Sequence, residues 1–497
     1  MKRLFVKGTV FVFWAVMLAW LIRYEAFPHY FSHSLAGYRD LVSSDILIED
    51  SWSKILFNGR PIGYSHTHEE TEDSSITGRY VIENHIELCV NLMGTTRRIH
   101  AETTVRLDAA FSLQRFSFQL SSGEYSLLVK GIRWQERTFD VSVRTVGGTE
   151  RLLIEIPDDV IIESPAMALA LERLKPGQHL VMRVFDPAMF ATASLTVRAL
   201  RKEPLEIGGT NYLATVLEID YRGAAIKAWL ADGQMLRQET PYGWTLERCS
   251  AEEAFEALRA AHGGEDMLTG MAVKCDGAIS NPTGARMLRL RLSGVALEGY
   301  TLESNRQKIL DSDASGIELL VSQAEPGPSE AKSLVTPELQ NFLAPSLFVQ
   351  ADHPEIQAQA LRIVHSRETA LEKARAICAW VNENVEKELT VSVPSALDVL
   401  RVRKGDCNEH TYLFAALARA AGLPCKVKLG VVYHEGTFYY HAWPAVFVGD
   451  WLEMDPTLGQ MAVDATHVAL LEGDLANHLE LVRIIGRLRI KVLEEIQ

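Results

Sequence analysis

Three residues near the C-terminus carry the side chains that cysteine-based acyl transfer needs. Cys407 lies in the segment GDCNEH, His441 begins HAW, and Asp455 begins DPT. A thiol, an imidazole and a carboxylate are the parts that make and orient a thiolate nucleophile. The sequence therefore predicts a catalytic group in which Cys407 is the nucleophile, His441 the base and Asp455 the orienting carboxylate.

The cysteine is expected at the start of a helix. Asp406 can serve as the N-cap with Glu409 at the third helical position, so Cys407 falls in the first turn. Gly422 and Pro424 then end this helix. Amides at a helix N-terminus stabilise a thiolate, as does a neighbouring imidazolium. This position is therefore expected to lower the pKa of the thiol.

The histidine and the aspartate are expected on the strands that follow. Period-two alternation places His441, Trp443, Ala445 and Phe447 on one strand face, which can present the imidazole to the helix start. Asp455 follows the next strand and can accept a hydrogen bond from the other ring nitrogen, which holds the tautomer. Trp443 is expected to wall the site and to contact substrate.

Other histidines offer alternative interpretations. His410 lies near the same helix face as Cys407, but no carboxylate that would orient it is evident, so a packing or solvated role is favoured. His66 and His68 share a strand face, which suggests a metal site. No third ligand is evident, so a solvated strand face is favoured, and no metal or other cofactor is expected.

Five segments in order, namely GDC, AGLP, HAW, GDW and DPT, resemble the transglutaminase-like superfamily, a papain-like cysteine fold. They fall within residues 346–475, about a quarter of the chain. The resemblance implies a thioester mechanism in which Cys407, His441 and Asp455 have the roles given above. The tail from Thr466 to Gly486 is also similar to that of bacterial membrane-associated members.

Two departures from the family pattern affect this resemblance. Pro444 and Ala445 follow the histidine segment where many members carry a polar or acidic residue, so a substrate contact is missing there. No upstream side chain that would complete the oxyanion hole is evident either, and the backbone amide of Cys407 is the one donor that the sequence indicates. The calcium ligands of the animal enzymes have no counterpart in this sequence.

The bulk composition limits the classes of function. The chain has 497 residues and a formal charge of −14, which predicts two or three domains and argues against nucleic acid as a partner. Positive residues precede an apolar run over 8–22, which Arg23 closes. No small-x-small cleavage site follows Ala19, so an uncleaved membrane anchor over residues 1–24 is favoured over a cleaved signal peptide.

The cysteines show no zinc-like spacing. Cys378 and Cys425 are expected to be buried small hydrophobes, whereas Cys407 must stay free to act. In an exported body Cys249 and Cys275 can pair as a disulfide, although spacing alone does not fix the connectivity. Both states of this pair stay open.

Residues 45–262 are predicted to form a β-rich domain with a large antiparallel sheet, curved or sandwiched, and a helix over 163–174 is the main exception. Its turn signals are Asn58-Gly59, Gly147-Gly148, Gly208-Gly209 and Asp232-Gly233. Residues 263–345 are predicted to hold a second β-rich segment and a Pro-rich linker, and 346–497 a transglutaminase-like domain with a C-terminal tail. The fold class is therefore α+β.

The sequence predicts a cysteine-dependent acyl-transfer enzyme that attacks an amide carbonyl through a thioester at Cys407. Release to water would make it a peptidase or amidase, and release to an amine a transglutaminase. The alternative is a non-catalytic envelope scaffold or peptide-binding protein. The expected partners are a protein or peptide substrate and, through residues 1–24, the cytoplasmic membrane, which the chain crosses once with its body outside the cytoplasm. The sequence does not predict an oligomeric state.

Overall fold

The computed structural model describes residues 33–34, 49–71, 80–108, 112–161, 171, 174–187, 190–221, 223–261, 266–327, 336–393, 395–473, 480–481 and 483–497. The expected membrane anchor at 1–24 lies outside these residues, as does most of the expected helix at 163–174. In the part of the chain that is described, no helix is both long enough and apolar enough to cross a bilayer.

The N-terminal region forms one 16-stranded sheet with the order β1-β11-β12-β13-β14-β15-β16-β2-β3-β4-β5-β6-β7-β8-β9, in which β10 also pairs with β11. All neighbours are antiparallel except the pairs that β1 and β10 make with β11. The strands are β1 (His33–Ser34), β2 (Glu49–Phe57), β3 (Arg60–Thr71), β4 (Tyr80–Leu92), β5 (Thr95–Leu107), β6 (Leu113–Ser122), β7 (Tyr125–Gln135), β8 (Thr138–Thr145), β9 (Gly148–Glu155), β10 (Val160–Ile161), β11 (His179–Asp186), β12 (Ala191–Ile207), β13 (Thr210–Tyr221), β14 (Ala224–Ala231), β15 (Gln234–Glu239) and β16 (Trp244–Cys249).

Tight hairpins and alternating burial shape this sheet. A hairpin turn lies at each of the predicted turn signals, between β2 and β3, β8 and β9, β12 and β13, and β14 and β15. Val129 on β7 and Val141 on β8 lie on the buried face of the sheet. Along each of these strands, buried residues alternate with exposed or half-buried ones. The ring of Phe116 on β6 lies 5.6 Å from that of Phe185 on β11, although these strands are far apart in the strand order. The sheet therefore curls, so that its two wings share one core.

One helix packs on the other face of the large sheet. Helix α4 (Ala251–Ala260) begins with the predicted capping box, in which Ser250 and Glu253 bond reciprocally to each other's backbone. Phe255 of α4 packs against Tyr64 of β3 and Trp52 of β2, with ring centroids 5.4 and 5.3 Å apart. This helix covers part of the face that strands β2 to β5 present outward.

A second sheet has five strands in the order β17-β27-β18-β20-β19. Its strands are β17 (Lys274–Asp276), β18 (Met287–Ser293), β19 (Gln307–Asp313), β20 (Gly316–Ser322) and β27 (Arg489–Ile496), and the short helix α5 (Met267–Met271) precedes it. The C-terminal strand β27 therefore pairs with β17 and β18, which lie in the second β-rich segment predicted for residues 263–345. Leu290 of this sheet and Val431 of the four-stranded sheet described below belong to one apolar cluster, so these two sheets pack as a unit.

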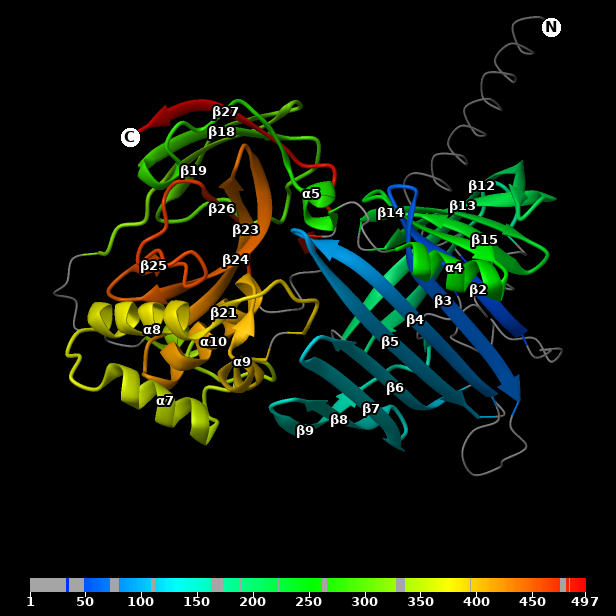
Figure 1. The fold of residues 1–497 in the computed structure, drawn as a ribbon, viewed down its shortest axis with the longest axis horizontal. Coiled ribbons are helices and arrows are strands. Elements are labelled where there is room, and N and C mark those ends of the chain that lie inside the picture. Colours follow the sequence, from blue (N-terminus) through cyan, green and yellow to red (C-terminus); the bar gives the residue numbers. More distant parts are fainter. Residues whose placement is uncertain are drawn as a thin grey trace, which may run out of the picture.

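The remaining residues form a helical group on a four-stranded antiparallel sheet with the order β25-β24-β23-β26. The elements are α6 (Pro337–Gln340), α7 (Pro354–Val364), α8 (Ala370–Asn384), β21 (Glu386–Lys387), α9 (Ala396–Val402), β22 (Lys404–Gly405), α10 (Cys407–Ala420), β23 (Cys425–His434), β24 (Thr437–Phe447), β25 (Trp451–Glu453) and β26 (His467–Glu472). Figure 1 shows these helices and the two smaller sheets on one side of the molecule and the large sheet on the other. This antiparallel, β-rich architecture with a separate helical group is the α+β class that the sequence predicted.

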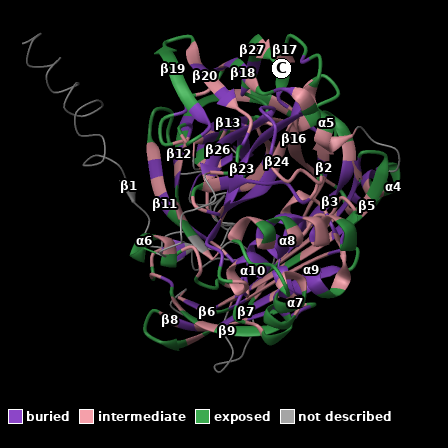
Figure 2. Cartoon of the chain, turned by 90° about the vertical axis from the view of Figure 1, so that its left-hand side faces the viewer, coloured by how far each residue is buried: buried purple, intermediate pink, exposed green. Residues whose placement is uncertain are grey.

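Burial is concentrated around α10. Ten consecutive residues of this helix, Glu409–Ala418, are buried, and strands β23, β24 and β26 beside it are mostly buried too (Figure 2). The predicted meander of β23, β24 and β25 is present, with turns at Glu435-Gly436 and at 448–450. Strand β26 was not predicted, and it pairs with the free edge of β23.

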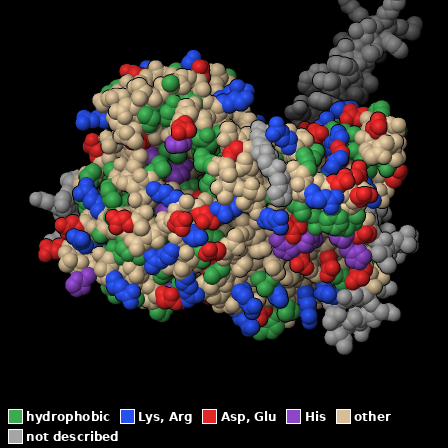
Figure 3. Space-filling model, in the orientation of Figure 1, with side chains coloured by type: hydrophobic (Ala, Val, Ile, Leu, Met, Phe, Trp, Pro, Cys, Tyr) green, Lys and Arg blue, Asp and Glu red, His purple; other side chains and the backbone are tan. Residues whose placement is uncertain are grey.

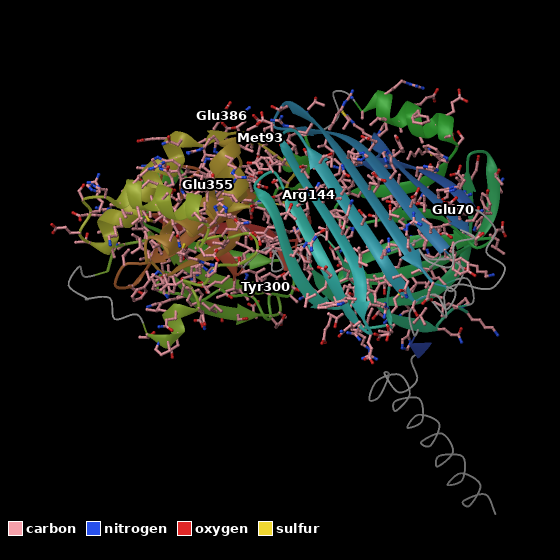
Figure 4. The ribbon with its side chains drawn as sticks, turned by 90° about the horizontal axis from the view of Figure 1, so that it is seen from below. Glu70, Met93, Arg144, Tyr300, Glu355 and Glu386 are labelled. Atoms are coloured by element: carbon pink, nitrogen blue, oxygen red, sulfur yellow. The ribbon has the colours of Figure 1, made fainter. Side chains whose placement is uncertain are left out.

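The helices α6 to α10 and their four-stranded sheet form the helical domain. The large sheet touches this domain close to the start of α10. The guanidinium of Arg97 on β5 lies 2.9 Å from the carboxylate of Glu388, directly after β21. In Figure 4, Met93 and Glu386 both lie at this junction. The β8–β9 turn also hydrogen-bonds to Asp398 of α9. Because β21 pairs with β22, which ends two residues before α10, the junction lies beside the helix that carries the cysteine.

Candidate active site

Cys407 is the first residue of α10, as the sequence predicted. Oδ1 of Asp406 accepts from the backbone N–H of Asn408 at 2.9 Å, and Oε2 of Glu409 accepts from the backbone N–H of Asp406 at 2.8 Å. The predicted capping box is thus complete. The Cys407 side chain is half-buried and packs against the apolar cluster that the two smaller sheets share.

The cysteine helix and the histidine strand are joined directly. Thr411 lies one helical turn after Cys407, and its hydroxyl donates to the backbone oxygen of Ala442 at 3.0 Å. The backbone N–H of Ala442 donates toward the Cys407 sulfur. Because Ala442 follows His441 on β24, these two contacts bring the strand that carries the imidazole to the start of the cysteine helix.

Asp455 orients the imidazole. Its Oδ1 accepts from the backbone N–H groups of Thr457 at 2.7 Å and Leu458 at 3.0 Å, and its Oδ2 lies 2.7 Å from Nε2 of His441. Nε2 is thereby engaged, and Nδ1 is the nitrogen left to face the thiol. Burial alone would raise the pKa of the Asp455 carboxyl, but the charge of His441 and hydrogen bonds from His441 and His467 hold it well below its usual range. The group is therefore a carboxylate.

His467 is a residue of this site that the sequence reasoning missed. It lies on β26 and is fully buried, with Nε2 3.1 Å from Oδ2 of Asp455 and Nδ1 3.3 Å from Oδ1 of Asp464. Burial would lower the pKa of His467, but its bonds to the two carboxylates raise it. His467 thus lies buried between two carboxylates that favour its protonated form. The available signal was an Asp three residues before a His, shortly after the DPT segment.

The ligand-type atoms of His441, Asp455 and His467 all lie within 4.8 Å of one another. Ligands around a tetrahedral zinc ion are about 3.3 Å apart, given metal–ligand distances of about 2.0 Å. Here one carboxylate oxygen touches both imidazoles directly, at 2.7 and 3.1 Å, in side chains that further contacts hold in place. Contacts this short are hydrogen bonds between the carboxylate and the two imidazoles, so the three ligand-type atoms are already paired with one another.

The electrostatics of the thiol differ from the expectation. Burial raises the pKa of Cys407 well above its usual range, and the carboxylates of Asp406, Glu409 and Asp455 add to this effect. The N–H of Ala442 opposes it. The prediction of a lowered pKa counted the helix amides but not the acidic residues that cap the same helix. The resting group is accordingly a neutral thiol.

Trp443 does not line an open cleft. It is fully buried, its ring stacks 5.9 Å from that of His441, and its Nε1 donates to Oε2 of Glu453 at 2.8 Å. Arg306 and Lys428 contact the same buried carboxylate, at 2.8 and 3.8 Å. The predicted contact of Trp443 with substrate therefore needs correction: the ring backs the imidazole, because Glu453 holds its polar edge inside the core.

His410 is not placed to act as the base. It is fully buried, and its Nδ1 lies 2.7 Å from the backbone oxygen of Asp406. Burial is the main cause that lowers the pKa of His410. A neutral imidazole held against its own helix is a packing residue, which agrees with the expectation.

A cysteine at a helix start, packed on an antiparallel sheet that carries a carboxylate-bound histidine, is the arrangement of papain-like thiol domains. Residues 357–456 match the sequence model of the Transglutaminase-like superfamily, and this part of the chain is a domain of that superfamily.

Two curated relatives match a part of the chain. The chain is 29% identical over 140 residues to kyphoscoliosis peptidase of Mus musculus, which covers 25% of this chain and 20% of that protein. The human form is 30% identical over 127 residues, which covers 22% of this chain and 18% of the relative. The chain thus spans about a fifth of the length of the curated relatives that it matches.

Solved structures with partial likeness include a provisionally assigned cysteine protease from Cytophaga hutchinsonii, 20% identical with a TM-score of 0.30, covering 41% of this chain and 82% of that one. Another is the periplasmic domain of TgpA from Pseudomonas aeruginosa, 15% identical with a TM-score of 0.28, covering 37% of this chain and 87% of that one. Scores this low carry no functional conclusion.

Proposed function

We propose that the protein is a cysteine-dependent acyl-transfer enzyme in which Cys407 attacks an amide carbonyl. The observation that carries this proposal is the pairing of His441 Nε2 with the Asp455 carboxylate at 2.7 Å, next to the backbone segment that contacts the Cys407 sulfur. An oriented base beside a thiol at a helix start is what nucleophilic acyl transfer requires.

The first half-reaction uses these three residues. Because the resting thiol is neutral, Nδ1 of His441 takes the S–H proton as the sulfur attacks the carbonyl carbon, and a C–S bond forms. The tetrahedral intermediate collapses when His441 gives that proton to the leaving nitrogen, the C–N bond breaks, and an amine departs. The product is a thioester at Cys407, and the buried Asp455 carboxylate stabilises the transient imidazolium.

The start of α10 supplies one donor for the oxyanion. The first N–H groups of a helix have no partner within it, and the Asp406 side chain bonds the N–H groups of Asn408 and Glu409. The N–H of Cys407, at the first helical position, is thus free of the cap and adjacent to the attacking sulfur. We assign it to the developing oxyanion.

His467 and Asp464 act as positioning residues in this scheme. His467 bonds the same Asp455 oxygen as His441, so it fixes the rotamer of that carboxylate and balances its buried charge. Asp464 fixes His467 in turn through Nδ1. Removing this support would loosen the base without removing any group that touches substrate.

The second half-reaction and the setting are further parts of the proposal. The thioester is resolved by water, which gives a peptidase or amidase, or by an amine, which gives a transglutaminase. The apolar run over 8–22 supports an anchor in the cytoplasmic membrane with the body outside the cytoplasm, where a protein or peptide would be the substrate.

Acylation by p-nitrophenyl acetate tests the first half-reaction. We expect a burst of p-nitrophenolate and a hydroxylamine-sensitive acetyl group on Cys407, found by peptide mass spectrometry. Cys407→Ala should lose the burst, whereas Cys275→Ala, which removes another half-buried thiol, should keep it. An equal burst in Cys407→Ala, or no acetyl group on Cys407, would favour the scaffold alternative. Adding an amine such as glycine amide during deacylation then separates hydrolysis from transfer.

A further inference from the structure

Two strands of the large sheet bring two histidines and a glutamate together, far from the cysteine in sequence. His85 and Glu87 are two residues apart on β4, so they share a face, and Glu87 pairs directly with His100 on β5. Strands β4 and β5 pair along their whole lengths without a register shift. Figure 3 shows histidine side chains gathered among acidic ones over this part of the sheet.

The ligand-type atoms of the three residues converge. Oε1 of Glu87 lies 2.9 Å from Nδ1 of His100 and 3.5 Å from Nε2 of His85, and all three atoms are within 4.8 Å of one another. Ligands of a tetrahedral zinc ion are about 3.3 Å apart, given metal–ligand distances of about 2.0 Å. The three side chains are each about one-quarter to one-third exposed, so small rotations can adjust these separations.

The chemistry and the surroundings also fit a metal. Two imidazoles and one carboxylate form a ligand set that zinc accepts, with a fourth position left for water. Oε2 of Glu102 lies 4.0 Å from Nε2 of His100, where a carboxylate can fix the ring once Nδ1 binds an ion. The rigid ladder beneath the residues holds the two histidines on adjacent strands, with rings 4.7 Å apart.

The neighbouring histidines are engaged differently. His66 bonds the Asp50 carboxylate through Nε2 and stacks on Trp52, with ring centroids 3.9 Å apart. The pattern His66-Thr67-His68, which suggested a metal site in the sequence, is therefore not a set of converging ligands in the structure. The converging set lies on the next two strands, β4 and β5.

We propose that His85, Glu87 and His100 form a binding site for a divalent transition-metal ion of the zinc type. This site is independent of the proposed acyl transfer, because it lies on the outer face of the large sheet. It gives this region of the protein a chemical role of its own, in addition to its contact with the helical domain.

Titration of the metal-free full-length protein with Zn²⁺ against a chromogenic chelator tests the site, in a Cys407→Ala background that removes the half-buried thiol of the candidate active site. We expect one zinc per chain. His85→Gln and His100→Gln should each weaken binding by more than about tenfold, and Glu102→Gln by about tenfold. His434→Gln, an exposed histidine on β23, and His66→Gln, a neighbour on the same face, should bind as the parent does.

Three results would overturn the site. They are no stoichiometric binding by the parent protein, parental affinity in both His85→Gln and His100→Gln, or an equal loss in His66→Gln, which would indicate diffuse binding to a histidine-rich face. Circular dichroism and thermal melting of the metal-free variants check that each still folds. Co²⁺ substitution gives an independent readout, because nitrogen and oxygen ligands produce visible d–d bands without thiolate charge transfer. A charge-transfer band would place the ion on a cysteine instead.

Discussion

His467 Nε2 lies 3.1 Å from the Asp455 oxygen that also bonds His441 Nε2 at 2.7 Å, so two histidines share one carboxylate oxygen. Asp464 contacts the far side of His467 at 3.3 Å. Burial would raise the pKa of Asp464, but its bond to His467 and the charge of that imidazolium lower it. The buried row is therefore Asp464, His467 and Asp455, in which each carboxylate favours the protonated form of the ring between them, with His441 at its open end.

Replacing His467 by Ala should slow acylation by about tenfold or more, whereas His467→Gln should keep most of the rate. The Gln amide can still donate to Oδ2 of Asp455, which holds that carboxylate toward His441, but Ala removes the contact altogether. Stopped-flow acylation with p-nitrophenyl acetate measures both rates, and circular dichroism checks that both variants fold. A parental rate in a folded His467→Ala variant would contradict the positioning role.

The same residue should make stability depend on pH. An unfolded histidine releases its proton near pH 6.5, whereas folded His467 retains it to higher pH because its pKa is raised. Its contribution is therefore complete below about pH 6.5 and is lost as the pH rises through the folded pKa. Urea unfolding between pH 6.5 and 8 should show a fall in stability that His467→Gln lacks. Parallel slopes in the two proteins would contradict the buried imidazolium.

Alkylation of Cys407 should follow a titration above the ordinary thiol range. Burial and the nearby carboxylates raise its pKa, so the iodoacetamide rate should reach its midpoint above about pH 8.5. Peptide mass spectrometry resolves Cys407 from the other cysteines. Asp406→Asn removes one of the opposing charges while keeping a cap, so it should move the midpoint down. A midpoint near pH 7 or below in the parent protein would show that the thiolate is the resting form.

Short-range signals explain what the sequence could predict. The Asp406/Glu409 cap, the end of α10 at Gly422 and the four hairpin turns depend on residues a few positions apart, and all are present. The adjacent strands β23 to β25 were predicted for the same reason. Each needs only local spacing and turn chemistry, which one sequence shows directly.

The missed features depend on partners that are distant in the chain. Arg306 reaches Glu453 from the bend just before β19, and β27 inserts between β17 and β18. His467 reaches Asp455 only because β26 adds to the free edge of β23. Pairings of this kind are set by tertiary packing, and single-sequence periodicity does not specify which strand edges meet.

Replacing Glu453 by Gln should destabilise the helical domain strongly. Its carboxylate is 1% exposed and faces Arg306 and Lys428, whose side chains are 4% and 2% exposed. Removing its charge leaves two buried cations less compensated, which costs about 3–5 kcal/mol. Urea unfolding measures the loss. The matched control is Asp313→Asn, which breaks an exposed ion pair with Arg291 and should leave the unfolding midpoint unchanged. A similar small effect for both variants would contradict the buried network.

The contact between the large sheet and α9 should depend on Asp398. This buried carboxylate accepts from the Thr145 hydroxyl at 2.7 Å and from the N–H of Gly147, and both donors lie at the β8–β9 hairpin. Asp398→Ala leaves them without their partner and should cost about 1–3 kcal/mol, seen as a lower urea midpoint and faster proteolysis at the junction. Gly147→Ala should act in the same direction, because its new Cβ would meet the Asp398 side chain.

The matched control for Asp398 is Glu355→Ala. Glu355 also contacts this part of the domain, through Arg401 of α9, but its carboxylate is about half exposed. An exposed ion pair contributes little, so this variant should unfold and resist protease as the parent does. If Asp398→Ala behaved like Glu355→Ala, the hairpin would not depend on the buried carboxylate. The large sheet would then be held to the helical domain by its other contacts, which include the ion pairs of Arg97 with Glu388 and of Lys404 with Glu124.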